Sequence, residues 1–296
     1  MSTTHFPILA RIVALTALLA GFLSPAVAGA EALQPFKDDL FSAQTVLESR
    51  DDGDFRRIDY QKMRDIYERD QIPEQRVKRR FVDLGIKKYQ ANETLGLGGR
   101  KLDLFRAGVA QNAAFTVIFI HGRGGDRRLG ANDYRFGGNF NRLKNLAVRN
   151  GGVYYAPSVR SFDAAGVSDV AGLIRYAAAQ SPGRPVILTC ASMGSFICWG
   201  VTRETEASLL SGMVILGGTT DPDFTQSVFH KAKLPIAFFH GSEDSVYAAT
   251  DQIAFYDRLH KAGYPARFTL FETGSHGTPI RLGEWRAVLN WLLAGR

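Results

Sequence analysis

Short apolar runs recur along most of the chain, and amphipathic segments separate them. The runs that have the length of a buried strand are residues 115–122, 151–158, 185–192, 211–218, 234–241 and 266–273. Strands that are apolar throughout are typical of parallel sheets with both faces covered. The intervening segments with apolar residues at helical spacing are residues 139–150, 167–180, 194–207, 250–263 and 282–295. This alternation predicts an α/β fold with a mostly parallel central sheet and helices on both faces.

The chain before residue 115 follows a different pattern. Residues 80–90 and 101–109 predict two strands joined by a glycine-rich turn. From residue 31 to about residue 75, apolar residues recur at spacings of three to four within a charged sequence. We expect residues 31–75 to form an N-terminal extension of two amphipathic helices packed against one domain, residues 76–296. A regulatory or partner-binding arm is the alternative.

The N-terminus has the composition of a secretory signal. A short basic start precedes an apolar stretch over residues 12–23, and small residues follow at Ala26, Ala28 and Ala30. The apolar stretch is shorter than the roughly 20 residues that span a bilayer. We therefore expect residues 1–30 to be a signal peptide that is cleaved near Ala28 or Ala30, which makes the mature protein periplasmic or secreted.

Composition and charge exclude several classes of protein. The chain has 296 residues, of which 45% are hydrophobic, and a formal net charge of +7. Basic residues are scattered among acidic ones without an aromatic–basic module, so nucleic-acid binding is not expected, whereas contact with an anionic membrane surface is compatible with the charge. No two histidines share a metal-ligand spacing with a nearby acid, and we expect neither a metal nor another cofactor.

Residues capable of chemistry follow five of the predicted strands. In chain order these segments are "HGRGGDRR", "CASMG", "TTDPD", "SEDSV" and "GSHGT". The carboxyl ends of parallel strands meet at one edge of a sheet, and ligands bind there. We therefore expect these five segments to surround one site.

A glycine loop followed by a serine, an acid and a histidine in this order resembles the α/β-hydrolase fold. The resemblance covers about three-quarters of the chain and implies that Ser192 of "CASMG" is a nucleophile on a sharp turn. The usual glycine two residues before the nucleophile is replaced by Cys190. The resemblance further implies that His276 takes the proton of Ser192 and that Asp244, in "HGSEDSV", orients His276.

The acid has alternatives at this stage. Glu243 adjoins Asp244, and Asp221 and Asp223 follow the preceding strand, where some members of the fold carry the acid. Asp244 fits the pattern of the fold best.

Backbone N–H groups would form the oxyanion hole that stabilises negative charge in the transition state. The resemblance assigns the first of these groups to Met193, the residue after the nucleophile. The second would come from Arg123 in the "HGRGG" loop, with Gly124 as the near alternative.

The only two cysteines of the chain flank the candidate nucleophile. Cys190 would end a strand, and Cys198 would lie well inside the next helix. Export would permit a disulfide bond between them. We nevertheless expect their Cα atoms to lie beyond bridging distance and both residues to be small buried side chains.

Two features bear on the substrate. The connection at residues 218–233 is short, so we expect no large lid domain and an active site open to accessible esters. Arginines cluster in and after the glycine loop: Arg123, Arg127, Arg128 and Arg135. They predict either a solvated surface loop or an anion site, in which Arg127 and Arg128 would bind a phosphate or carboxylate of the substrate.

The sequence thus predicts an exported serine hydrolase of the carboxylesterase, lysophospholipase or thioesterase type, acting on a small-molecule or lipid ester. A peptidase or a dienelactone-hydrolase-like enzyme is the alternative within enzymes. A non-catalytic binding protein with the same fold is the alternative outside them.

Overall fold

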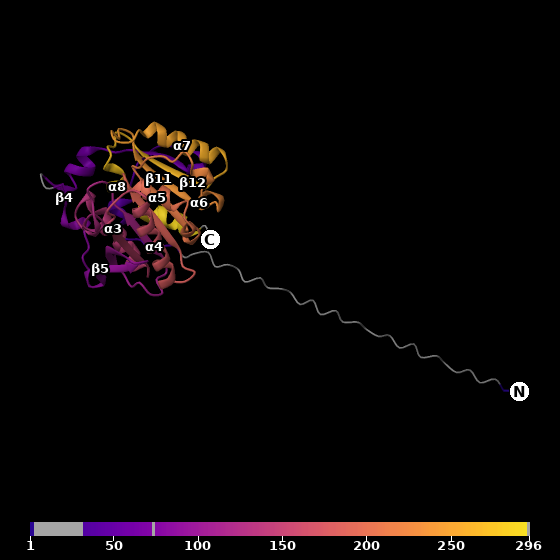
Figure 1. Cartoon of the computed structure of the whole chain (residues 1–296). Coiled ribbons are helices and arrows are strands. Elements are labelled where there is room, and N and C mark those ends of the chain that lie inside the picture. The colour runs from indigo at the N-terminus through magenta and orange to yellow at the C-terminus, as the bar shows by residue number, and fades with distance from the viewer. Residues whose placement is uncertain (3–31, 73–74, 295–296) are drawn as a thin grey trace.

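The computed structural model describes residues 1–2, 32–72 and 75–294 (Figure 1). The predicted signal peptide, apart from its first two residues, lies outside these described residues, as does the predicted cleavage near Ala28 or Ala30.

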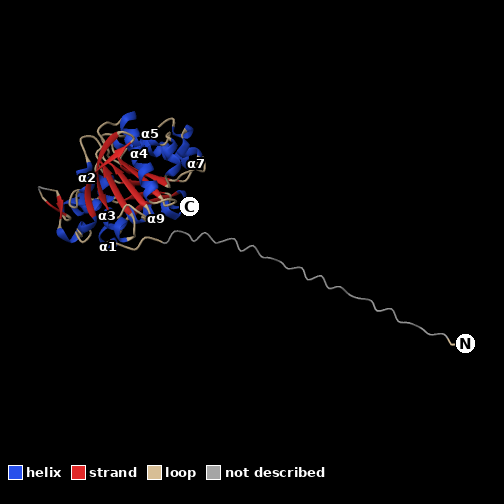
Figure 2. Cartoon of the chain, turned by 60° about the horizontal axis from the view of Figure 1, so that its bottom comes forward, coloured by secondary structure: helices blue, strands red, loops and turns tan. Residues whose placement is uncertain are grey.

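The described part of the chain is built around one ten-stranded sheet with the order β1-β2-β12-β11-β10-β9-β7-β8-β6-β5. Figure 2 shows these strands in red, enclosed by helices in blue. The strands are β1 (Val46–Arg50), β2 (Phe55–Ile58), β5 (Gln90–Leu97), β6 (Arg100–Ala107), β7 (Thr116–Ile120), β8 (Val153–Pro157), β9 (Val186–Ala191), β10 (Gly212–Leu216), β11 (Ile236–Gly241) and β12 (Ala266–Phe271). A second sheet of two short strands, β3 (Asp70–Gln71) and β4 (Arg76–Val77), lies at one end of the molecule in Figure 1.

The middle of the large sheet is parallel. Every neighbouring pair from β2 to β8 in the sheet order is parallel, and the pairs β1–β2, β6–β8 and β5–β6 are antiparallel. The predicted α/β class with a mostly parallel central sheet is therefore confirmed.

Helices cover both faces of the sheet because successive strand residues point to opposite faces. The helices are α1 (Asp38–Phe41), α2 (Arg127–Ala131), α3 (Asn139–Arg149), α4 (Ala164–Gln180), α5 (Gly194–Val201), α6 (Val228–Lys231), α7 (Ala249–Lys261), α8 (Thr278–Leu282) and α9 (Trp285–Ala294). Val117 and Phe119 of β7 pack in the same cluster as apolar residues of α3 and α9. Ile118 and Ile120 pack with residues of α4, α5 and α7 on the other face. Both faces of the central strands are thus buried.

The expectation of an N-terminal extension of two helices is wrong. Among the described residues of this region, the helical segments are α1, a 3₁₀ turn (Asp51–Gly53) and a single π-helical turn (Met63–Tyr67). The strands β1 and β2 join the large sheet beside β12. In β2, Phe55 and Ile58 are buried, and the Phe55 ring stacks on Phe268 with 5.4 Å between centroids. Burying these apolar side chains on an existing sheet edge stabilises a strand where the local pattern favours a helix.

The first strand of the predicted hairpin lies later than expected. Residues 80–90 contain two short 3₁₀ turns (Arg79–Phe81 and Lys87–Tyr89), and the strand β5 begins only at Gln90. The strand β5 is alternately half-buried and exposed, as expected for an edge strand, and its apolar residues are too sparse to mark it in the sequence.

The connection between β10 and β11 is short and carries only a 3₁₀ turn (Phe224–Gln226) and α6. The expectation of no large lid domain at this position is confirmed. Within the described residues, no helix has the length and apolar character that a bilayer crossing requires.

Candidate active site

Ser192 lies on a sharp turn between β9 and α5. Its φ angle is +54°, in the left-handed region that residues other than glycine rarely adopt. The Ser192 N–H donates to the Leu216 carbonyl at 3.0 Å, and the Ser195 N–H and hydroxyl both donate back to the Ser192 carbonyl at 2.9 and 2.7 Å. These bonds hold a conformation that costs on the order of 1–3 kcal/mol and expose the Ser192 hydroxyl above the strand end.

Two glycines give this turn its space. A Cβ atom at position 122 would lie 2.8 Å from the Cβ of Ser192. A Cβ atom at position 194 would lie 2.7 Å from the carbonyl oxygen of His121. The glycine loop after β7 therefore packs directly against the nucleophile turn.

Three side chains from three strand ends form a hydrogen-bonded chain. His276, after β12, lies with Nε2 at 2.8 Å from the Ser192 Oγ and with Nδ1 at 2.8 Å from the Asp244 Oδ2. The structure thus brings together the serine, histidine and acid that the sequence singled out.

Asp244 is held as a carboxylate in a buried position. Its Oδ1 accepts the N–H groups of Val246 and Tyr247 at 2.8 and 3.1 Å, while Oδ2 faces His276. Burial by itself raises the pKa of Asp244, but the hydrogen bonds from His276 and from the two N–H groups outweigh it, so the net pKa is lowered. A negative charge therefore stands behind the imidazole at neutral pH.

The loops that carry Asp244 and His276 are tied to each other. The Glu243 N–H donates to the Gly274 carbonyl at 2.9 Å. A Cβ atom at position 241 would lie 2.2 Å from that same carbonyl oxygen, so only glycine fits there. This close packing fixes the separation of acid and base.

The alternative acids have other surroundings. Asp221 accepts two 2.8 Å hydrogen bonds from Arg203, and Asp223 and Glu243 are exposed. Of these four acidic side chains, Asp244 is the one in contact with His276.

The glycine loop is fixed by a buried histidine. His121 is 2% exposed, and its Nδ1 contacts the Gly122 carbonyl at 2.8 Å while its Nε2 accepts the Val159 N–H at 3.0 Å. Burial lowers the pKa of His121, so the ring is neutral and donates from Nδ1. A turn closed by the Gly125 N–H on the Gly122 carbonyl follows, and such a turn leaves the N–H groups of Arg123 and Gly124 unused.

The expectation for the two cysteines is wrong. Cys190 and Cys198 form a disulfide bond with their Cα atoms 6.2 Å apart, and both residues are fully buried. The turn at Ser192 is sharp enough for α5 to fold back against β9, which brings a residue about one turn into the helix within reach of the strand end. The bond closes a loop that contains the candidate nucleophile.

Removing this disulfide with the double substitution Cys190→Ala/Cys198→Ala is expected to lower the free energy of unfolding by about 2–3 kcal/mol, because the short closed loop no longer restricts the unfolded chain. Urea denaturation of both proteins measures the difference. Wild-type protein treated with iodoacetamide while unfolded in urea without reductant is the control for the bond itself, because both sulfurs stay unmodified there only if they are bonded to each other. An unchanged urea midpoint would contradict the prediction.

The clustered arginines separate into two groups. Arg127 lies 3.6 Å from Asp103, and Arg128 forms a 2.6 Å ion pair with Asp126. Arg123 and Arg135 line a cavity of about 580 Å³ beside the glycine loop; Arg128 also reaches it, but Arg127 is not part of its lining. The structure therefore places Arg127 outside the hollow nearest the candidate oxyanion loop.

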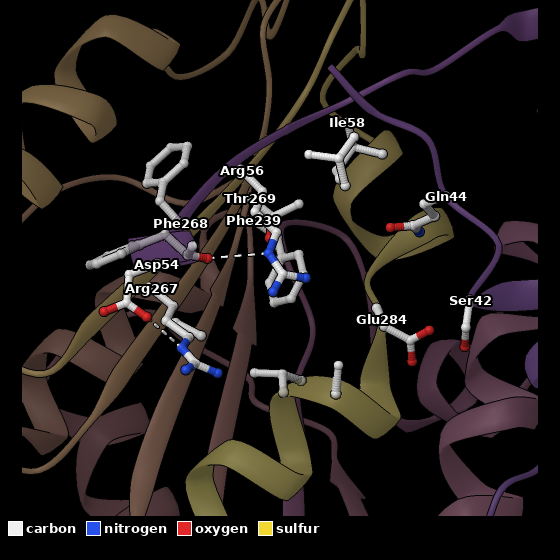
Figure 3. Close-up of a pocket in the computed structure, with 16 residues that line it drawn as sticks. Ser42, Gln44, Asp54, Arg56, Ile58, Phe239, Arg267, Phe268, Thr269 and Glu284 are labelled. Carbon is white, nitrogen blue, oxygen red and sulfur yellow. Dashed lines mark hydrogen bonds and ion pairs between the residues drawn. The ribbon is translucent and has the colours of Figure 1, made fainter. Parts of the chain in front are cut away.

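Of two other cavities, one adjoins His276 and the other lies away from the predicted site residues. A hollow of about 440 Å³ is lined by Ser275 and Gly277, the neighbours of His276, and by Arg135 and Phe136. A smaller cavity of about 150 Å³ lies between β2, β11, β12 and α9, where Arg267 pairs with Asp54 (Figure 3). Residues near the triad line the first hollow, and none of the predicted site residues lines the second.

Comparisons with known proteins identify the fold. No family model matches the chain, and a search of curated proteins finds no match. Among solved structures, a thermostable esterase matches with a TM-score of 0.57 at 19% identity over 70% of this chain, and the chain spans only 63% of that protein's length. An esterase of Pyrococcus furiosus matches with a TM-score of 0.53 at 14% identity over 71% of this chain and 95% of the other.

A protein of unknown function from Agrobacterium tumefaciens, provisionally described as an alpha/beta hydrolase, matches with a TM-score of 0.54 at 14% identity over 69% of this chain and 94% of the other. The chain has the α/β-hydrolase fold. The resemblance inferred from the order of the strand ends is confirmed at this level.

Proposed function

We propose that this protein is an exported serine hydrolase that cleaves carboxylic esters through an acyl-enzyme intermediate. The observation that carries the proposal is the chain of two 2.8 Å hydrogen bonds from Ser192 through His276 to Asp244. Solved structures that share the fold include proteins named as esterases, which supports esters as the substrate class.

In the proposed reaction, the Ser192 Oγ attacks the ester carbonyl while His276 Nε2 takes the hydroxyl proton. Asp244 stabilises the resulting imidazolium. The tetrahedral oxyanion accepts hydrogen bonds from the Met193 N–H and from the Arg123 or Gly124 N–H. His276 then returns the proton to the departing alcohol, which leaves Ser192 acylated. A water molecule, deprotonated by His276, releases the acid and restores the serine.

The surroundings of Ser192, His276 and Asp244 support a proposal for the type of ester. The short connection between β10 and β11 supports a carboxylesterase, thioesterase or lysophospholipase that acts on accessible esters. The arginines that line the cavity beside the glycine loop support a preference for esters that carry an anionic group.

Two features support export. The N-terminal thirty residues have the composition of a signal peptide. The Cys190–Cys198 bond belongs to a class of cross-link that persists in oxidising compartments outside the cytoplasm. We therefore propose a periplasmic or secreted location.

A fluorophosphonate probe tests the proposed activity. The purified protein is expected to become labelled, and mass spectrometry of the digested protein is expected to find the phosphonate on the peptide that contains Ser192. Rates on matched oxygen-ester, thioester and peptide substrates then rank the chemical classes. Absence of labelling would count against a serine hydrolase and favour a binding protein, and a peptide substrate as the fastest would favour the peptidase alternative.

A further inference from the structure

The cavity beside the glycine loop is strongly basic. It is lined by four arginines and one aspartate together with uncharged residues, the charged set being Arg76, Arg123, Arg128, Arg135 and Asp126. Its volume of about 580 Å³ is large enough for a substrate group.

Ion pairing distinguishes these arginines. Arg128 is neutralised by Asp126 at 2.6 Å. Within the described residues, Arg76, Arg123 and Arg135 form no ion pair with a carboxylate. These three guanidinium groups are therefore available to an external anion.

Arg135 has the most central position. It lines the basic cavity and also the 440 Å³ hollow beside His276, which is bounded by Ser275 and Gly277. A group bound by Arg135 would thus lie between the oxyanion loop and the candidate general base.

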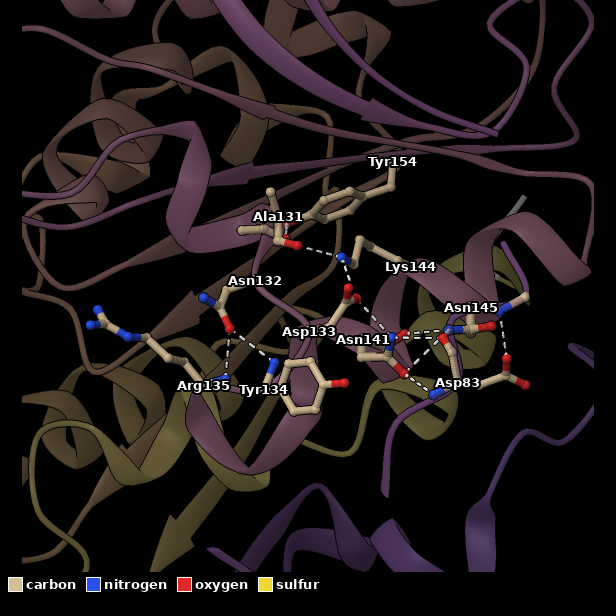
Figure 4. A network of polar contacts seen from close by, with 12 residues as sticks. Asp83, Ala131, Asn132, Asp133, Tyr134, Arg135, Asn141, Lys144, Asn145 and Tyr154 are labelled. Atoms are coloured by element: carbon tan, nitrogen blue, oxygen red, sulfur yellow. Dashed lines mark hydrogen bonds and ion pairs between the residues drawn. The ribbon is translucent and has the colours of Figure 1, made fainter. Parts of the chain in front are cut away.

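The backbone around Arg135 is held by a polar network (Figure 4). The side-chain oxygen of Asn132 accepts the N–H groups of Tyr134 and Arg135 at 2.9 and 2.8 Å. In Figure 4 the Arg135 side chain points away from this network. The backbone of the loop is therefore fixed, and the Arg135 side chain takes no part in the network.

A buried ion pair anchors the same loop to α3. The fully buried Lys144 donates to Asp133 at 2.7 Å and to the Ala131 carbonyl at 2.5 Å, and Asn141 donates to the same Asp133 oxygen at 2.7 Å. Burial lowers the pKa of Lys144, and Asp133 opposes that shift. Because a buried cation is costly without its partners, this arrangement strongly favours one position of the loop.

The N-terminal segment supplies the second arginine. The Val77 N–H in β4 donates to the Tyr134 carbonyl at 3.0 Å, and the Arg76 guanidinium lies over the Tyr134 ring at 4.3 Å from its centroid. The neighbouring strand β3 is tied to α8 by the buried ion pair of Asp70 with Arg281 at 2.7 Å. The short strand β4 thus contributes Arg76 to the cavity wall.

We propose that Arg135, assisted by Arg76, binds the anionic group of the substrate and makes the enzyme selective for esters that carry a phosphate or carboxylate near the scissile carbonyl. This inference rests on the proposed ester hydrolase function and names its substrate class. Two guanidinium groups on separate elements can each donate a pair of parallel hydrogen bonds to the oxygen atoms of one phosphate or carboxylate.

The test compares kcat/KM on two pairs of substrates, each with a neutral member and a member that carries an anionic group: monobutyrylglycerol with butyrylglycerol 3-phosphate, and dimethyl adipate with monomethyl adipate, the rate on dimethyl adipate being counted per ester group. Arg135→Gln is expected to lower kcat/KM roughly tenfold for the anionic member of the preferred pair, mainly through KM, and to leave the neutral member within about threefold. A selective loss on the glycerol esters would indicate that Arg135 binds a phosphate on the alcohol part of the substrate. A selective loss on the adipate esters would indicate a carboxylate on the acyl part.

Two further variants separate recognition from general damage. Asn132→Ala removes the side-chain acceptor that holds the Arg135 backbone, and it is expected to reduce the anionic-to-neutral ratio of kcat/KM in the same direction. Arg184→Gln removes an exposed arginine before β9, at the opposite end of the strand from Ser192, and is the charge-matched control that should leave the ratio unchanged.

Binding of glycerol 3-phosphate, measured by calorimetry, tests the cavity without any hydrolysis. Weaker binding by Arg135→Gln than by wild type would support the inference even if no ester were cleaved. Equal losses on neutral and anionic esters, or a selective loss in Arg127→Ala in place of Arg135→Gln, would overturn it. Failure of the wild type on every ester would count against the proposed function alone.

Discussion

Replacing Ser192 with alanine is expected to lower kcat for ester hydrolysis about 10⁶-fold, to the level of the catalysis that remains without a nucleophile. No other hydroxyl lies within hydrogen-bonding distance of His276 in the described part of the chain, so the base has no second nucleophile to activate. Initial rates on a short p-nitrophenyl ester measure the effect, and the same variant should lose fluorophosphonate labelling.

The matched control is Ser208→Ala, which removes an exposed hydroxyl in a surface turn that donates only to the Thr205 carbonyl. It should retain wild-type rates and labelling. Hydrolysis or labelling that survives in Ser192→Ala would show that the nucleophile lies elsewhere.

The cluster of Ser192, His276 and Asp244 could be predicted from the sequence because the topology of the sheet brings the three residues together. Ser192, Asp244 and His276 are far apart in the chain, but each follows a parallel strand, and the carboxyl ends of such strands meet at one edge. The positions of those strands could be read from the sequence, since a strand that is buried on both faces forms a continuous apolar run. The replacement of glycine by Cys190 did not mislead, because the packing at the turn depends on Gly122 and Gly194.

The N-terminal strands could not be predicted, because the apolar spacing within each segment does not mark a strand. The contacts that stabilise these strands come from residues far away in the sequence. The segment "FRRI" that forms β2 has apolar residues three apart, a spacing that also fits a helix. What favours the strand is a free edge at β12 and the stacking of Phe55 on Phe268, more than 200 residues later in the chain. A contact of that sequence separation leaves no signal in a short window.

The cavity arginines show the same limit at the level of side chains. Arg127 and Arg128 follow shortly after the glycine loop in the sequence, but they lie beside Asp103 and Asp126 and pair with them. Arg135 lines the cavity because the Lys144–Asp133 ion pair holds its loop in place. Arg76 lines it because β4 is hydrogen-bonded to the same loop. The sequence thus identified a basic region, but only the ion pairs in the structure show which of its arginines are free to bind an anion.

Replacing Asp244 with asparagine is expected to lower kcat about 10⁴-fold while leaving KM for a neutral ester nearly unchanged. The carboxylate accepts the Nδ1 proton of His276 at 2.8 Å, which leaves Nε2 unprotonated and facing Ser192. A carboxamide can present its NH₂ group to Nδ1, which favours the opposite tautomer, and it carries no charge to stabilise the imidazolium. Steady-state kinetics on the short p-nitrophenyl ester separates kcat from KM.

Glu243→Gln is the matched control, because it makes the same chemical change at the adjacent, exposed acid that the sequence left as an alternative, and it should stay within about threefold of wild type. The pH dependence of stability gives a second readout. Because the pKa of Asp244 is lowered in the folded state, its contribution to stability is present above the pKa of the unfolded chain and is lost as the pH falls through the folded value. Asp244→Asn should therefore flatten the loss of stability in acid. A larger kinetic loss in Glu243→Gln than in Asp244→Asn would move the orienting role to Glu243 and contradict the geometry of the site.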